Sequence, residues 1–366
     1  MLTHFFHSQT IHTKQTNERL SRLNHISNLH VKPPAKFNTK YGQFNNHFFK
    51  HLETLKSPNR NEEDLVINPR IQTIHNVYQP SFTNMHKVTG FGDFIRGCLY
   101  VLEFSEKHNV SCHFHIHNHN LKKYLMYFTN RPPIRDAISN NIYKYPGLNA
   151  EFTAHQRKIE YTILPSMEKS FLLYLNSLPN YMGNVYINTT NFPSHFISPD
   201  NIDKMKHMLE PIPSLKSTVF HCMNKHQLIP KTYITYHIRL GDHFLENPTD
   251  TLIHQTIVQE VLQKMVLRPN ETYLLITDTP ALKKIVMTYF KGKGNNIRCL
   301  LLDIGHTSKN EDTIGIKNTL IEFYVMSFSK AIISMSIYPH GSGFSKWCSV
   351  VYNIPYVCYL LSSYTF

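Results

Sequence analysis

The sequence lacks the signals that mark a secreted, membrane-spanning or disulfide-rich protein. Its 6 cysteines are scattered without a CxxC pair, so reduced, buried thiols are expected instead of a disulfide framework. No run approaches the roughly 18 apolar residues of a membrane span. The first residues contain no basic segment followed by an apolar core, as a signal peptide does. We therefore expect a cytoplasmic protein without a stable membrane anchor.

Common phosphate and metal signatures are also missing. The segment GKGNN at 292–296 lacks the spacing and the Ser or Thr of a Walker sequence. No GxGxxG follows a predicted strand, which argues against a dinucleotide dehydrogenase. There is no Asp-x-Asp pair to chelate a metal-bound diphosphate. The simpler hypothesis is a site without metal or cofactor, in which an arginine neutralises the anion.

The composition is that of a folded, basic protein. A length of 366 residues with 41% hydrophobic and 12% aromatic residues allows two domains and excludes global disorder. The net charge of +13 favours anionic partners. This charge is diffuse, with no Lys/Arg block among aromatic residues, so a nucleic acid is a less favoured partner than a small anionic substrate.

The residue pattern predicts three parts. Residues 1–70 are rich in Asn, His, Lys and Thr and predict a largely irregular, loosely ordered leader. The order of elements then predicts one α/β domain over 71–225 and a second over 226–366. In the second, strands at 232–238, 272–277, 297–303 and 331–336 each precede a helix, and a last apolar run covers 355–361. This alternation predicts a parallel, Rossmann-like sheet.

The segment GFGDFIRG at 90–97 predicts a glycine-rich loop before a helix. Gly90 and Gly92 permit a tight turn, Asp93 is placed to cap the helix, and Arg96 falls in its first turn. On its own such a turn is a weak signal.

A strand over Val110–Asn118 follows this helix, and further on the apolar run Phe171–Leu178 is also strand-like. The first strand puts histidines at period two on one face, where a metal site and a half-exposed polar face lining a cleft are both conceivable. We favour the polar face, because alternate residues of one strand do not converge and no Cys or carboxylate lies among them. The residues concerned are His113, His115, His117 and His119.

Polar groups follow three strands of the second predicted domain, where ligands bind in open α/β sheets. The sequence HIRLGD at the end of the first strand supplies His237, Arg239 and Asp242, and LLITDTP supplies Asp278. An Arg and an Asp at strand ends can simply pair with each other, and Asp278 can equally cap the next helix. The fourth strand ends in Ser334 and Ser336, and a glycine-rich turn follows before a helix that starts near 344–345. Backbone N–H groups at that helix start can hold an anion. The residues of this turn are Gly341, Ser342, Gly343, Phe344 and Ser345.

These segments resemble a known family. HIRLGD, LLITDTP and TLIEFYVMSFSKAIISMSIYPHGSGFSKWCSVVY look like the donor-site segments of the α1,2/α1,6- and protein O-fucosyltransferase superfamily, which has the GT-B fold of two Rossmann-like domains facing a cleft. GFGDFIRGCLYVLEFSEKHNV resembles the turn and first helix of the acceptor-side domain in that family. The resemblance covers most of residues 71–366 in order and is sharp only in these four segments.

The resemblance implies inverting transfer of fucose or a related sugar from a GDP-sugar, without a metal, to a glycan or protein acceptor. By position, Arg239 would contact the β-phosphate, His237 and Asp278 the nucleoside, and residues 342–345 the diphosphate. Where many members carry a second basic residue after the Arg, this chain has Leu240. A general base is not fixed by the motif. Asp242 and Glu246 are nearest in sequence, and Asp93 could face them.

Two other functions stay open. The chain could be a nucleotide-sugar-binding module without catalysis, or a basic nucleic-acid-binding protein.

Overall fold

The computed structural model describes one compact unit of the chain, within Leu65–His155 and Thr162–Phe366. The leader expected over residues 1–70 lies outside the described residues apart from 66–70, and the predicted domain boundary near 225 stays a prediction. The described residues are 66–78, 90–131, 143–145, 168, 171–176, 183–193, 197–241, 244, 253, 255–305, 313–338 and 341–361.

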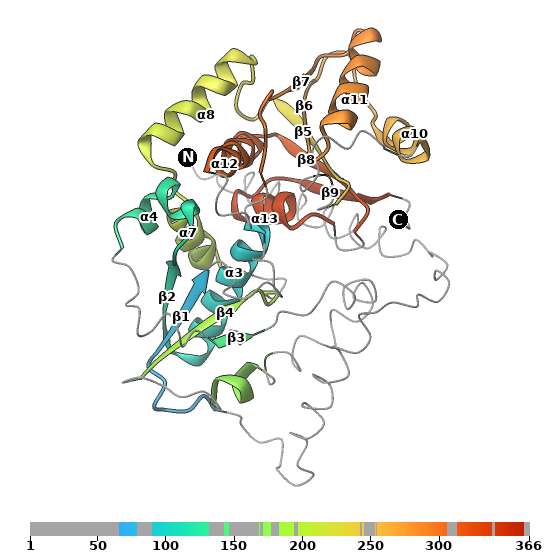
Figure 1. Cartoon of the computed structure of the whole chain (residues 1–366). Helices are drawn as coiled ribbons and strands as arrows, with labels where there is room; N and C mark the ends of the chain where they lie inside the picture. Colours follow the sequence, from blue (N-terminus) through green and yellow to red (C-terminus); the bar gives the residue numbers. More distant parts are fainter. Residues whose placement is uncertain are drawn as a thin grey trace, which may run out of the picture. The chain divides into compact units, whose positions relative to one another are not determined.

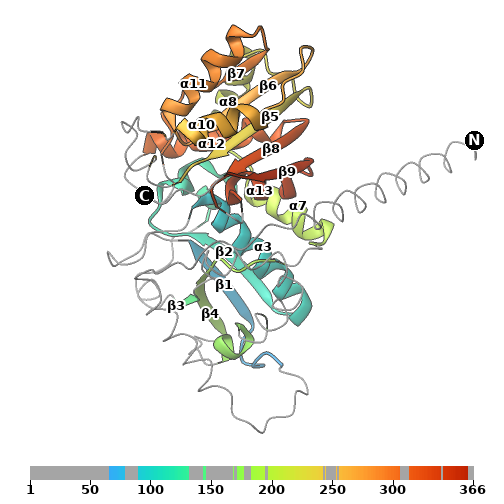
Figure 2. The same cartoon turned by 90° about the vertical axis from the view of Figure 1, so that its right-hand side faces the viewer.

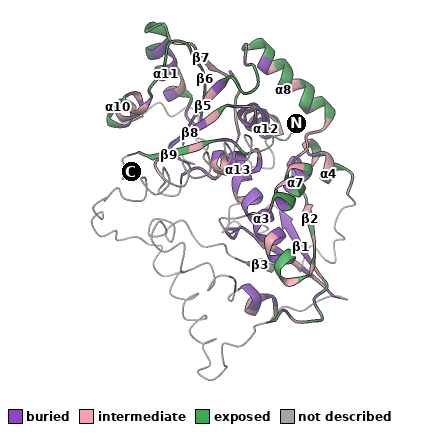
Figure 3. Ribbon diagram, turned by 180° about the vertical axis from the view of Figure 1, so that it is seen from behind, coloured by how far each residue is buried: buried purple, intermediate pink, exposed green. Residues whose placement is uncertain are grey.

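The earlier part of this unit contains a four-stranded parallel sheet. Its order is β2-β1-β4-β3, and the long helix α3 (Phe91–His108) packs against it (Figure 1). Strand β4 alternates between half-buried and buried positions, as expected for a strand with one face on the core. Figure 3 shows α3 buried along most of its length. The strands are β1 (Thr73–Tyr78), β2 (Ser111–Ile116), β3 (Tyr143–Tyr145) and β4 (Asn184–Thr189).

The later part contains a five-stranded parallel sheet of order β7-β6-β5-β8-β9. Counted along the chain, this is the order 3-2-1-4-5 of the Rossmann fold. The predicted α/β class and parallel sheets are therefore confirmed. The strands are β5 (Tyr233–Arg239), β6 (Thr272–Thr277), β7 (Ile297–Cys299), β8 (Ala331–Ser336) and β9 (Tyr356–Leu360).

Helices cover both faces of this second sheet (Figure 2). Tyr236 and Ile238 of β5 belong to the core formed with α10 (Gln255–Lys264) and α11 (Pro280–Gly292). Tyr233, on the opposite face of the same strand, belongs to the core formed with α12 (Thr313–Ser327) and α13 (Gly343–Val351). Because successive side chains of a strand point to opposite faces, β5 is anchored from both sides.

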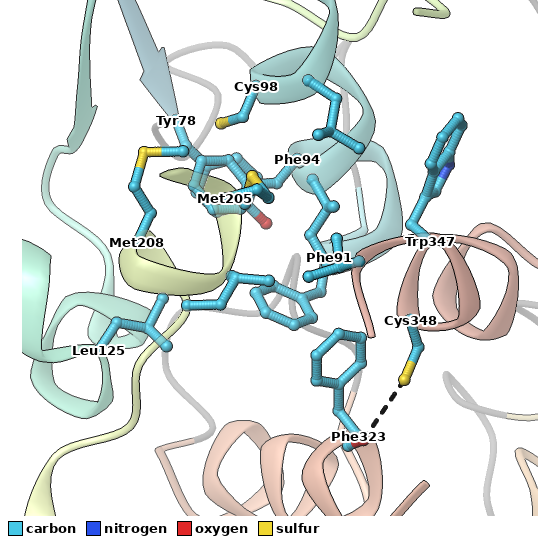
Figure 4. Packing of buried hydrophobic residues seen from close by; sticks show 14 of the residues in the cluster. Tyr78, Phe91, Phe94, Cys98, Leu125, Met205, Met208, Phe323, Trp347 and Cys348 are labelled. Carbon is cyan, nitrogen blue, oxygen red and sulfur yellow. Dashed lines mark hydrogen bonds between the residues drawn. The ribbon is translucent and has the colours of Figure 1, made fainter. Parts of the chain in front are cut away.

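The hydrophobic core is continuous from the first sheet to the second. One cluster holds Phe91 and Phe94 of α3 together with Phe323 of α12 and Trp347 of α13, and Figure 4 shows the Phe91 and Phe323 rings next to each other. The helices α3 and α13 are therefore joined by direct packing.

Four further helical elements lie in the described part of the chain. Ser198 is the N-cap of α7, and its Oγ accepts a hydrogen bond from the Asn201 backbone N–H at 3.3 Å. Pro199 and Pro213 lie in the first turns of α7 and α8, where a missing N–H costs nothing. These elements are the 3-10 helix η1 (Asn120–Tyr124) and the helices α4 (Met126–Thr129), α7 (Pro199–Met208) and α8 (Pro213–Lys225).

Three local predictions are wrong. The segment 171–176 is helical instead of a strand, because its leucines favour a helix as readily as a buried strand. Gly90, not Asp93, is the N-cap of α3, so Gly92 and Asp93 lie in the helix and not in the turn before it, while Arg96 lies in the helix as predicted. Strand β2 ends at Ile116, and the last two histidines of the row therefore do not continue its face.

None of the helices in the described ranges is long and apolar enough to cross a membrane.

Candidate functional site

The candidate site lies at the carboxyl ends of β5, β6 and β8. In the order β7-β6-β5-β8-β9, the strand order reverses between β5 and β8. Arg239, the last residue of β5, pairs in register with Ser336, the last residue of β8. Ligands of doubly wound sheets bind at this reversal point, outside the carboxyl ends of the strands. The structure thus brings the predicted polar strand ends to one edge.

Arg239 is held by the carboxylate of Asp278. The distance from Arg239 Nη1 to Asp278 Oδ2 is 3.1 Å, and the side chains are 16% and 3% exposed. Asp278 also accepts hydrogen bonds from the backbone N–H groups of Leu240, at 3.1 Å, and Gly241, at 2.9 Å. A third donor is the hydroxyl of Thr279, at 3.0 Å. Asp278 therefore fixes both the guanidinium and the backbone that follows β5.

The predicted cap role of Asp278 is not what the structure shows. The N-cap of α11 is Thr279, and no side chain makes a capping hydrogen bond there. Gly241 has φ +132°, a conformation that favours glycine. This backbone lets the Gly241 N–H turn toward the carboxylate.

His237 lies in a buried hydroxyl network. Its Nδ1 is 2.9 Å from Ser345 Oγ, which in turn donates to Ser334 Oγ at 3.3 Å. Burial, assisted by the charge of Arg239, lowers the pKa of His237 to about 3. The imidazole is therefore neutral at physiological pH, and its role is to connect β5 with the first turn of α13.

The turn before α13 brings its backbone close to the side chain of Cys358 in β9. Gly341 has φ +74°, and a Cβ at this position would lie 2.9 Å from Cys358 Sγ. The N-cap, Ser342, makes no capping hydrogen bond through its side chain. Helix N-termini of this kind leave backbone N–H groups available to an anion. The Oγ of Ser336 accepts a hydrogen bond from the Tyr338 backbone N–H at 3.1 Å, and its place in the donor-binding site stays a prediction.

The predicted acceptor-side residues lie against this turn. Asp93 pairs with Arg96 at 3.1 Å. The Arg96 guanidinium lies 4.0 Å from the centre of the Phe192 ring and its Nε donates to the Thr190 carbonyl. A Cβ on Gly343 would lie 3.8 Å from Asp93 Oδ1. The 35% exposed Asp93 carboxylate thus lies beside the start of α13.

Of the predicted general bases, Asp242 and Glu246 lie outside the described residues, and Asp93 lies within them. No group of three or more His, Cys, Asp or Glu side chains is placed to hold a metal ion in the described part of the chain.

Glu322 was missed in the sequence analysis. It is 1% exposed, its Oε1 lies 3.6 Å from Lys283 Nζ, and burial raises its pKa to about 7 although the lysine opposes this shift. The signal was a single carboxylate inside the apolar stretch LIEFYVM of α12. Buried carboxyls of this kind mark functional regions more often than surface carboxyls do.

The histidine row forms a cluster away from this site. His75 Nδ1 is 3.0 Å from His115 Nε2, and the His75 ring stacks on Tyr186 with centroids 4.3 Å apart. His113 is exposed on the same side, whereas His119 caps η1. The half-exposed polar face predicted for β2 is therefore limited to His113 and His115.

No family model matches the sequence, and no curated protein matches it. Several solved structures that the chain resembles are fucosyltransferases. A structure of the fucosyltransferase NodZ from Bradyrhizobium is 13% identical, with 77% of this chain and 93% of that chain covered and a TM-score of 0.42.

Two further structures give the same picture. A mutant of Arabidopsis thaliana FUT1 in complex with GDP is 10% identical over 90% of this chain and 82% of that chain, with a TM-score of 0.46. POFUT1 in complex with GDP-fucose is 9% identical over 81% of this chain and 99% of that chain, with a TM-score of 0.40. Identities and scores this low leave the function of the chain to be argued from its own residues.

Proposed function

We propose that the protein is an inverting, metal-independent glycosyltransferase that transfers fucose or a related sugar from a GDP-sugar. The observation that carries the proposal is the arginine at the end of β5, held by Asp278 beside the reversal point of the sheet. A guanidinium matches the geometry of a phosphate, and its fixed orientation suits a diphosphate better than a mobile lysine would. The resemblance of the four motif segments to the fucosyltransferase superfamily supports a GDP-sugar as the donor.

The proposed chemistry depends on electrostatics. An acceptor hydroxyl attacks the anomeric carbon while the bond to the diphosphate oxygen breaks, so that negative charge grows on the leaving GDP. Arg239 and the N–H groups at the start of α13 stabilise that charge most in the transition state. Asp93 is the described candidate to accept the hydroxyl proton, and Asp242 and Glu246 are the alternatives. His237, neutral and hydrogen-bonded to Ser345, would support the donor-binding turn.

A donor screen tests the proposal directly. Thermal shifts are measured with a panel of nucleotide-sugars and free nucleotides, because stabilisation grows as RT ln(1 + [L]/Kd) and ranks the ligands. We expect GDP and GDP-sugars to stabilise the protein, and UDP-sugars to do so less.

Turnover is then followed as hydrolysis or transfer of the best donor. Arg239→Ala should abolish it, since charge-assisted hydrogen bonds contribute roughly 1.5 to 3 kcal/mol each. Unchanged hydrolysis in this variant would contradict the proposal. Affinity without any transfer or hydrolysis would instead indicate a binding module, and steep salt dependence of RNA or DNA binding with indifference to GDP would indicate a nucleic-acid-binding protein.

A further inference from the structure

The first turn of α3 lies directly on the first turn of α13. A Cβ built on Gly92 would lie 2.3 Å from the carbonyl carbon of Gly343 and 2.5 Å from the backbone nitrogen of Phe344. Both neighbours are main-chain atoms, which cannot rotate away as a flexible side chain can. Position 92 therefore accepts only glycine while the two helices keep this distance. In an exposed helix glycine is unfavourable by about 1 kcal/mol relative to alanine, so this close packing gives Gly92 a physical reason to be there.

Aromatic packing holds this contact in place. The Phe91 ring meets the Phe323 ring edge to face, with centroids 4.9 Å apart, and Phe323 also contacts Phe344, with centroids 5.3 Å apart. Trp347, 5% exposed, lies on the next turn of α13, and a Cβ built on Gly343 would lie 3.7 Å from its Cδ1. With α13 fixed by these rings, an added atom at position 92 has no space to enter without moving the helix start.

We propose that Gly92 is a positioning residue for donor binding, because its missing side chain seats the start of α13 in the orientation in which its N–H groups meet the diphosphate. This inference rests on the proposed function. A methyl group at position 92 displaces the Gly343–Phe344 peptide by about 1 Å, and misplacements of that size can lower rates about 100-fold. The sequence pattern predicts a turn at Gly92, whereas the structure places this residue in the first turn of α3.

The experiment compares Gly92→Ala with two matched glycine variants. Gly97→Ala lies on the same helix and clashes at 2.0 Å with the Thr189 carbonyl oxygen, away from α13, while Gly292→Ala meets nothing within 4 Å. Trp347 is the one tryptophan in the sequence, so its emission and its quenching by acrylamide report on α13 without any ligand. GDP affinity per folded molecule is measured by titration calorimetry, and kcat and KM are measured with the best donor.

We expect Gly92→Ala to change the Trp347 emission and to weaken GDP binding at least tenfold. Gly97→Ala should lower stability while GDP affinity stays within twofold, and Gly292→Ala should change neither. GDP affinity within twofold of wild type in a folded Gly92→Ala protein would overturn the proposal.

Hydrogen exchange of the wild-type protein provides a test if Gly92→Ala does not fold. GDP should slow amide hydrogen exchange in residues 91–95 as well as in 343–346, although only the second segment is proposed to contact the nucleotide. Protection confined to 343–346 would show that the two helix starts are not coupled. Absence of GDP binding by the wild type would refute the proposed function, whereas the Trp347 emission of Gly92→Ala would still show whether Gly92 positions α13.

Discussion

Replacing Asp278 by asparagine should weaken both the fold and the donor site. The carboxylate is 3% exposed and pairs with Arg239, and it accepts hydrogen bonds from the N–H groups of Leu240 and Gly241. Asparagine keeps one acceptor oxygen but turns an NH2 group toward these donors, and it removes the charge that faces the guanidinium. Breaking a buried, hydrogen-bonded pair on one side costs about 3 to 5 kcal/mol. We therefore expect Asp278→Asn to lower the free energy of unfolding by about 3 kcal/mol or more.

The assay is urea unfolding, combined with GDP titration of the folded variant. Asp203→Asn on α7 is the matched control, because Asp203 pairs with Lys206 at 2.9 Å but is 71% exposed, and exposed pairs contribute about 0 to 1 kcal/mol. GDP affinity should fall in Asp278→Asn and not in the control. If the free energy of unfolding of Asp278→Asn lies within about 1 kcal/mol of the wild-type value and its GDP affinity is unchanged, Asp278 does not hold Arg239 in place.

Three further substitutions test the same region. Arg239→Lys should lose nearly as much turnover as Arg239→Ala, because lysine lacks the planar fork, and steady-state kinetics showing substantial recovery would contradict this. Burial raises the pKa of Glu322 to about 7, so the folded state binds this proton more tightly than the unfolded state does. The free energy of unfolding therefore falls by about 3 kcal/mol as the pH rises from 4.5 to 7. Urea unfolding at both pH values should show this loss in the wild type and not in Glu322→Gln. Gly341→Ala should lower the Tm more than Gly294→Ala does. Both glycines have positive φ, but only at Gly341 would an added Cβ meet a close neighbour, Cys358 Sγ at 2.9 Å. Equal decreases in Tm would show that the structure relaxes to accommodate this contact.

Most of the second sheet could be predicted from sequence because its elements carry local signals, although β7 ends at Cys299 and not at the predicted residue 303. β6 was predicted as residues 272–277 and β8 as 331–336, and the structure gives the same bounds. Each of these runs is apolar and ends in a polar residue that begins a turn, and such signals depend only on neighbours in the chain. The apolar run at 171–176 is too short for its periodicity to distinguish a helix from a strand, and the strand predicted there is a helix in the structure.

The contacts of the site could not be predicted in the same way, because they join residues far apart in the chain. His237 meets Ser345 across 108 positions, and Arg239 meets Asp278 across 39. The sequence placed these residues at one edge of a sheet through topology alone. The choice of hydrogen-bond partners depends on how the elements pack against each other. The role of Gly92 also depends on packing, because its close contact with Gly343 joins two helices and does not form a turn.

The geometry separates the polar groups that fix the site from those that can meet a ligand. Both oxygens of Asp278 accept hydrogen bonds from the protein, and Ser336 accepts one from Tyr338, so these groups are already used to hold the loops after β5 and β8. The contact with Asp278 uses Nη1 of the Arg239 guanidinium. The first turn of α13 has no side-chain cap. In the described part of the chain, this edge therefore combines a guanidinium with a helix N-terminus, and both features favour an anion such as a diphosphate.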